Sequence, residues 1–417
     1  MKKQTTTNKL WTRDFTIITL GTVVSMFGNS LSGFTMSLLV LDYTQSTLYY
    51  AIYLATFTLP QIIMPIFSGA ILDRFSRKKM IYTLDFISGG LYLIMAAQLS
   101  TGWFSFPVFA VYCFIIGTIN SIYIVAYESF YPLLISEGNY SKAYSISSVL
   151  ETASAIMVPI SKWLYDLVGI GPLLAGNALC FIIAATMETQ IKAKENYIDT
   201  QKEHRTESKK VKQVLSDIKE GFRYLSAEKG LLAVAIYFGF SALSGGVEGT
   251  VMLPYFKGAF ENGEYLYMLV MGSAILGRCI GGLIHYVVKL PVNKKFTIAF
   301  LVYVSLCVLE GTYLFVPIPI AMVMSFTTGI LGITSYTIRI SATQSYVPDE
   351  KKGRFNGAFN MISTVGAFAG ELMVGAVSEF IPLRAIQAAT LGLCAVAAVV
   401  FIGGNKKHIS PIYNRQE

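Results

Sequence analysis

Twelve long blocks of mostly apolar residues follow one another along this chain, and they constrain its fold more than any other feature. Each block has about 18–28 residues, enough for a helix to cross the roughly 30 Å hydrocarbon core of a bilayer. Only 14% of the 417 residues are charged, against roughly 25% in a typical soluble protein. The blocks therefore predict an all-α integral membrane protein with twelve transmembrane helices. The expected spans are residues 15–41, 49–72, 80–100, 105–134, 143–168, 172–190, 231–256, 265–288, 296–316, 318–346, 355–380 and 384–404.

One long polar stretch interrupts this series between the sixth and seventh spans. Residues 191–230 hold ten Lys or Arg and indicate a cytoplasmic linker. Apolar residues recur every three to four positions in its distal part, 214–232, which predicts an amphipathic helix along the membrane surface. The linker divides the chain into an N-terminal six-helix half, 1–190, and a C-terminal six-helix half, 231–417.

The positive charges predict the orientation of the chain. Of the 33 Lys and Arg residues, 28 lie in the two ends, the linker and alternate short loops. Because cytoplasmic loops retain Lys and Arg, both termini are expected in the cytoplasm of a multi-pass cell-membrane protein. This placement also explains the net charge of +8 without a nucleic-acid partner. The five cysteines lie inside apolar blocks without metal-site spacing, so neither a metal nor another cofactor is expected.

The two halves repeat short patterns at one offset. Glu128–Pro132 at the end of the fourth span matches Gln344–Pro348 at the end of the tenth, 216 residues later. Lys78-Lys79 matches Lys294-Lys295 at the same offset. Such repeats predict two six-helix halves related by a pseudo-twofold axis, with a substrate cavity at their interface.

The loop after the second span has a distinctive sequence, GAILDRFSRKK, which begins at Gly69. It places one carboxylate, Asp73, among several cations, including Arg74 and Arg77. This loop resembles the signature loop between the second and third helices of the major facilitator superfamily. The resemblance implies that Asp73 engages the start of the eleventh span, where Arg354 lies, and that these residues latch the halves in one conformation.

Three further segments resemble bacterial drug exporters of the macrolide-efflux type. They are Tyr131–Ser136, Asp217–Leu225 and Gln344–Arg354. The resemblance implies export of amphipathic or apolar molecules, coupled to protons by antiport. The fifth span keeps Pro159 but lacks the neighbouring glycines of many drug antiporters. Uptake symport of a polar nutrient and export of a lipid-like substrate therefore stay open. No metalloprotease, P-loop, nucleophile-elbow or channel-filter motif indicates an enzyme or a channel.

The resemblance also implies that spans one, four, seven and ten line the cavity, and each carries a polar stripe at helical spacing. For any single Ser or Thr, a hydrogen bond between helices is an equally good interpretation. The candidate cavity residues are Ser25, Asn29, Ser32 and Met36; Asn120, Tyr123, Tyr127 and Tyr131; Tyr237, Ser241, Ser244 and Glu248; and Ser325, Thr328, Gly332, Ser335 and Arg339.

Ionisable residues inside the spans are costly and usually face partners or water. Among them, Glu248, Glu128, Glu371 and Glu151 are candidates for proton coupling, because a desolvated carboxyl group can titrate near working pH. The alternative is a buried ion pair, with Arg278 or Arg339. Glu310 lies in the ninth span, 296–316, on a class of helix that usually faces lipid. Expected partners are a small-molecule substrate, protons and membrane lipid, and the protein is expected to act as a monomer.

Overall fold

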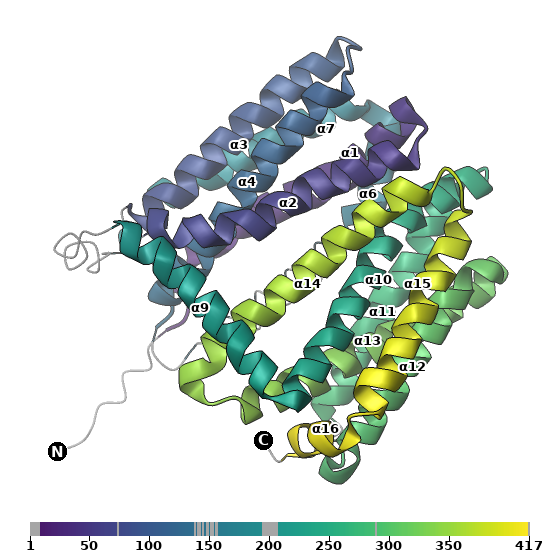
Figure 1. Ribbon diagram of the computed structural model, residues 1–417. Helices are drawn as coiled ribbons and strands as arrows, with labels where there is room; N and C mark the ends of the chain where they lie inside the picture. Colours follow the sequence, from purple (N-terminus) through teal and green to yellow (C-terminus); the bar gives the residue numbers. More distant parts are fainter. Residues whose placement is uncertain are drawn as a thin grey trace, which may run out of the picture. The chain divides into compact units, whose positions relative to one another are not determined.

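The computed structural model describes residues 9–72, 75–136, 157–193, 207–287 and 290–415, with single positions between 136 and 157. All regular secondary structure in these ranges is helical (Figure 1). Eleven of the described helices are long and apolar enough to cross a membrane. The predicted all-α membrane fold is confirmed.

The helices correspond one by one to the expected spans. The part of the fifth span that precedes α6, including Glu151, lies outside the continuously described residues. The elements are α1 (Arg13–Thr44), α2 (Thr47–Leu72), α3 (Arg77–Ser100), α4 (Phe106–Phe130), η1 (Tyr131–Leu134), α6 (Met157–Val168), α7 (Ile170–Thr189), α9 (Glu207–Ala227), α10 (Lys229–Ala259), α11 (Gly263–Val287), η2 (Val292–Lys294), α12 (Lys295–Thr312), η3 (Tyr313–Phe315), α13 (Ile318–Tyr346), α14 (Asp349–Val377), α15 (Leu383–Ala397), the π-turn η4 (Ala398–Gly403) and α16 (Lys406–Tyr413).

Local sequence sets several helix ends. The Thr12 side chain accepts a hydrogen bond from the Phe15 N–H at the start of α1, and Ser76 accepts one from Lys79 at the start of α3. Both side chains satisfy backbone donors that lack a partner in the first turn. Pro317, Pro348 and Pro382 immediately precede α13, α14 and α15. Proline is common at such boundaries because it cannot continue a preceding helix.

The chain divides into two compact units. The N-terminal unit comprises residues Met1–Gln45 and Leu59–Val211. Within it, α3 packs along α7 and α4, while α1 packs on α7 and α6. The ring of Tyr92 stacks on Phe181 with centroids 5.6 Å apart, which joins α3 to α7.

The C-terminal unit comprises Ser46–Thr58 and Lys212–Glu417, so it includes the first part of α2. Its main pairs are α10 with α14, α11 with α13, and α12 with α13 and α15. The linker forms α9, which is longer towards its N-terminus than the amphipathic pattern at 214–232 indicated. The Thr58 hydroxyl donates to the Glu371 carboxylate at 3.0 Å and ties the first part of α2 to α14.

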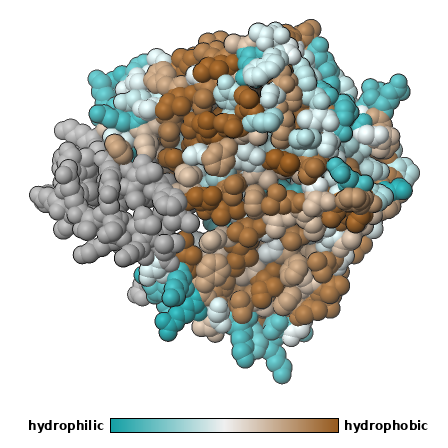
Figure 2. Space-filling view, turned by 45° about the horizontal axis from the view of Figure 1, so that its top comes forward, coloured by the Kyte–Doolittle hydropathy of each residue, from teal (hydrophilic) through white to brown (hydrophobic). Residues whose placement is uncertain are grey.

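Hydrophobic side chains cover much of the surface. Figure 2 shows broad brown areas on the visible face, and leucines and valines on several helices are more than half exposed, as Val287 and Leu283 illustrate. A soluble monomer rarely exposes contiguous apolar patches of more than a few hundred Å2. This surface is the one expected of helices in lipid.

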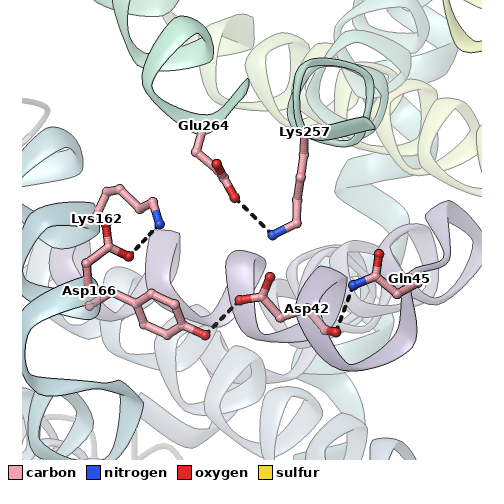
Figure 3. Close-up of polar contacts among 7 residues, drawn as sticks. Asp42, Gln45, Lys162, Asp166, Lys257 and Glu264 are labelled. Carbon is pink, nitrogen blue, oxygen red and sulfur yellow. Dashed lines mark hydrogen bonds and ion pairs between the residues drawn. The ribbon is translucent and has the colours of Figure 1, made fainter. Parts of the chain in front are cut away.

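Polar contacts near helix ends are shown in Figure 3. In the N-terminal unit, Lys162 pairs with Asp166 four residues away, and Asp42 accepts a hydrogen bond from Tyr165 at 2.8 Å. In the C-terminal unit, Lys257 pairs with Glu264 at 3.0 Å. These pairs hold charged groups at the ends of apolar helices.

Candidate functional site

The C-terminal unit contains a cavity of about 490 Å3 between α10, α11, α12, α13 and α15. Its lining combines apolar side chains, hydroxyl groups, two carboxyl groups and two guanidinium groups. The principal lining residues are Tyr237, Phe238, Ser241, Ser244, Glu248, Met252, Tyr267, Met271, Arg278, Leu306, Glu310, Ser325, Thr328, Gly332, Ser335, Tyr336 and Arg339. All the residues that the sequence selected on spans seven and ten line this one cavity.

Glu248 lies on the face of α10 that also carries Ser241 and Ser244, at spacings of seven and four residues. Tyr313, the first residue of η3, donates a hydrogen bond to Glu248 Oε1 at 2.6 Å. Glu248 interacts electrostatically with two charged residues of the same cavity, Arg278 and Glu310. The Glu248 carboxyl group therefore accepts a hydrogen bond from one neutral donor and also interacts with one cationic and one acidic side chain.

Arg339 on α13 lies against aromatic rings. Its guanidinium carbon is 5.1 Å from the Phe238 ring centre, 4.7 Å from that of Phe359 and 5.5 Å from that of Tyr336. Rings favour a cation over their faces. Among the described residues no carboxylate pairs with Arg339, so the stack takes the place of the alternative ion pair considered from the sequence.

The other carboxyl candidates lie elsewhere. Glu371 on α14 accepts from Thr58 and does not line the cavity. Glu128 on α4 is exposed, and Glu151 lies outside the described residues. Glu310 corrects the sequence interpretation, because it lines the cavity instead of facing lipid. Of the three predicted proton carriers that the structure describes, only Glu248 lines the cavity.

The candidates on α1 lie mostly in the packed interior of the N-terminal unit. Ser25, Ser32 and Met36 are buried, whereas Asn29 is exposed. Asn177 on α7 donates to the Ser32 hydroxyl at 2.7 Å, so Ser32 joins two helices. Cavity lining by this face stays a prediction.

Three tyrosines among the candidates on α4 and η1 form an aromatic ladder. Tyr123 stacks on Tyr127 with centroids 6.0 Å apart, and Tyr127 on Tyr131 at 5.2 Å. Thr22 of α1 donates to the Tyr127 hydroxyl at 3.3 Å. Asn120 lies on the same helix and is half-buried. Cargo contact by this ladder also stays a prediction.

The predicted latch is only partly described. Asp73 and Arg74 lie outside the described residues, and Gly69 lies in α2. Arg77 donates to the Ser129 carbonyl at 2.9 Å within the N-terminal unit. Arg354, at the start of α14, pairs with Glu220 of α9 at 2.8 Å.

The ion pair between Arg354 and Glu220 lines a surface cleft of about 410 Å3 between α9 and α14. Its lining is rich in cations: Ser216, Lys219, Glu220, Arg223, Tyr224, Ala227, Lys351 and Arg354.

Comparison with known sequences identifies related proteins over most of the chain. The sequence profile of the Major Facilitator Superfamily matches residues 18–371. The uncharacterised MFS-type transporter YkuC of Bacillus subtilis (strain 168) is 22% identical over 296 residues, which cover 67% of this chain and 68% of that protein.

Solved transporter structures share the fold. The nucleoside transporter NupG aligns with a TM-score of 0.64 and 14% identity over 93% of this chain and 98% of its own. The D-xylose-proton symporter gives 0.67 and 13% over 94% and 97%. A bacterial homologue of the iron transporter ferroportin, in its inward-facing state, gives 0.66 and 13% over 94% and 98%. At such identities the likeness shows the fold alone.

Proposed function

The chain belongs to the Major Facilitator Superfamily, and we propose that it exports amphipathic small molecules in exchange for protons. The observation that carries this proposal is the cavity of the C-terminal unit, where a carboxyl group, Glu248, lies among aromatic, apolar and hydroxyl side chains. The superfamily consists of transporters, so we assign no enzymatic activity.

The lining supports an amphipathic cargo. Phe238, Met271 and Leu306 offer apolar surface, and burial of cargo against them gains about 25 cal/mol per Å2. Such contacts tolerate a loose fit. The hydroxyl groups of Ser241 and Ser335 can each satisfy one polar group of the cargo, since a polar group left unpaired costs about 1–3 kcal/mol.

Glu248 is the proposed coupling residue. When it binds a proton, the cavity loses one negative charge beside Arg278, which changes the field that a bound cargo meets. Competition between proton and cargo for one cavity is sufficient for exchange if the site opens alternately to the two sides. The other residues of the cavity would then select the cargo.

The direction and orientation rest on the sequence. The segments Tyr131–Ser136, Asp217–Leu225 and Gln344–Arg354 resemble macrolide exporters, and the excess of Lys and Arg supports cytoplasmic termini. The transporter would work in a lipid membrane. A monomer would be sufficient for transport because the cavity is built from one chain.

Uptake of a polar nutrient with protons is the second candidate. One observation favours it: Glu248, Arg278, Glu310 and Arg339 give the cavity four ionisable groups that could orient a hydrophilic molecule. A cargo of this class would need several fixed hydrogen bonds to offset its desolvation.

Equilibrium binding in lipid nanodiscs separates the two candidates. The panel comprises a macrolide, ethidium and a lysolipid on one side, and xylose, a nucleoside and an amino acid on the other. We expect saturable binding of the first group only. Saturable micromolar binding of a polar nutrient without any binding of the amphipathic probes would reject the export proposal.

A matched pair of variants ties binding to the cavity. Gly332 lines the cavity and Gly282 does not, and a Cβ added at either position meets nothing within 4 Å. Gly332→Leu adds a bulky side chain to the cavity and should weaken binding at least about tenfold, a change of 1.4 kcal/mol. Gly282→Leu should leave binding unchanged.

A further inference from the structure

Two acidic side chains are buried together in the N-terminal unit, and neither is among the predicted proton carriers. Asp85 on α3 is 2% exposed, and Glu188 near the end of α7 is 1% exposed. The two helices approach closely at Gly89, where an added Cβ would lie 2.8 Å from Ile182 Cγ1 and 3.2 Å from the Ala178 carbonyl oxygen. Gly89 is one turn beyond Asp85, so the same helix contact brings the carboxyl groups together.

The two carboxyl groups interact with each other and lack other donors. The side chains of Asp85 and Glu188 interact electrostatically with each other. Asp85 Oδ2 and both Glu188 oxygens are buried without a donor among the described residues. A hydrogen bond between two carboxyl groups requires a proton on one of them, because an ionised carboxylate only accepts.

No cation compensates the pair within the described part of the chain. Neither carboxyl group forms an ion pair with Lys, Arg or His there. The cations at the start of α3, Arg77 and Lys78, donate to the carbonyl groups of Ser129 and Ile191.

The neighbouring helices contribute only neutral groups. From α1, Gly21 leaves room for Glu188, whose Oε1 would be 3.2 Å from an added Cβ. From α4, the Tyr123 hydroxyl is an electrostatic neighbour of both carboxyl groups and interacts with Ser25 of α1. Tyr123 is thus the one titratable group from another element that the structure places against the pair, within the described residues.

We propose that Asp85 and Glu188 form a proton-binding site in the N-terminal half, in which one carboxyl group is protonated and donates to the other. Two negative charges side by side, desolvated and without a cation, would cost far more than one shared proton. The pair therefore binds protons as a unit, and the proton belongs to neither residue alone. The site is independent of the cargo, the direction of transport and Glu248.

Infrared spectroscopy of the full-length protein at neutral pH, in dodecyl maltoside micelles that contain no ester carbonyl group, tests this directly. A protonated carboxyl group gives a carbonyl band that is resolved from carboxylate and amide bands and shifts in D2O. We expect the wild-type spectrum to contain such a band and Asp85→Asn/Glu188→Gln to lose it. Glu248→Gln should retain it, which assigns the band to this pair and not to the C-terminal cavity.

The single variants make the test independent of whether the double variant folds. Asp85→Asn and Glu188→Gln each leave one carboxyl group beside an amide, so each should change the position or intensity of the band. A wild-type spectrum without the band, or a band unchanged in both monodisperse single variants, would overturn the proposal. Failure of cargo export would not affect this result, so the two proposals can fail separately.

Discussion

Glu248 carries the proposed proton, and Glu248→Gln preserves its size while removing its charge. We expect this variant to bind cargo but to lose uphill transport, because a glutamine cannot exchange a proton. Glu379→Gln is the matched control, since Glu379 is exposed, does not line the cavity and is not a candidate for proton coupling. Gradient-driven transport that persists unchanged in Glu248→Gln would place the coupling proton elsewhere.

Arg339 illustrates a second effect at the scale of single residues. Lysine keeps the charge of arginine but not its flat guanidinium group, which stacks on rings. Arg339→Lys weakens contacts with Phe238, Phe359 and Tyr336, each worth about 0.5–1 kcal/mol. We expect a lower melting temperature in detergent, with Arg278→Lys as the control at an exposed cavity position. Equal melting temperatures for Arg339→Lys and wild type would show that the stack does not stabilise the protein.

Residues on one helix could be grouped from the sequence, whereas partners from different helices could not. Helical spacing alone placed Tyr237, Ser241, Ser244 and Glu248 on one face, and these residues line one cavity. The roles of Glu310 and Glu188 depend on which helices pack together, and spacing along one helix contains no such information. Glu188 also lies near the end of its span, where an acidic residue looks like part of a loop.

At the scale of elements, α11 and α13 cross at glycines. A Cβ added to Gly277 would lie 2.0 Å from the Phe326 carbonyl oxygen, and one added to Gly329 would lie 2.1 Å from that of Ala274. Glycine spacing of this kind allows close backbone approach in membranes. We expect Gly277→Ala to destabilise the protein by about 1–3 kcal/mol through overpacking.

Gly282→Ala is the control for this crossing. It changes the same helix by the same methyl group, but its Cβ meets nothing within 4 Å. Thermal unfolding of both variants in the same detergent measures the difference. A Gly277→Ala protein as stable as Gly282→Ala would mean that the two helices can separate without cost.

Helix existence was predictable, but helix ends were less so. Hydropathy placed the start of the eleventh span at 355, whereas α14 begins at Asp349, immediately after Pro348. Polar residues at the start of a helix can lie outside the apolar span, so hydropathy reports the lipid boundary and not the end of the helix. The proline was the better signal here.

At the scale of the whole molecule, the loop after α2 is the proposed latch. Asp73→Asn should reduce transport while leaving expression and membrane insertion intact, because asparagine cannot form the charge-assisted bond that the resemblance implies. Asp166→Asn is a suitable control: its i,i+4 pair with Lys162 involves no residue of the latch and is worth about 0.3–0.5 kcal/mol. Normal transport by well-expressed Asp73→Asn would remove the loop from the mechanism.

The membrane class followed from hydropathy, and eleven of the described helices are long and apolar enough to span a membrane. Hydropathy succeeds here because the cost of exposing polar groups to lipid acts on each segment separately. Residues Ser46–Thr58 group with the C-terminal unit, and the boundary at the linker, 191–230, stays a prediction. Packing of one helix against another depends on side-chain shape, which apolar composition does not encode.

The direction of coupled transport tests the proposed exchange most directly. Proteoliposomes would be prepared with an acidic or an alkaline lumen, with valinomycin and equal K⁺ on both sides to hold the membrane potential at zero. Ethidium serves as cargo because its permanent charge prevents passive trapping by a pH gradient. Exchange moves cargo against the protons whichever way the protein is inserted. We predict accumulation only in vesicles with an acidic lumen, and none with Glu248→Gln or without protein; accumulation only in vesicles with an alkaline lumen would show symport and contradict the proposal.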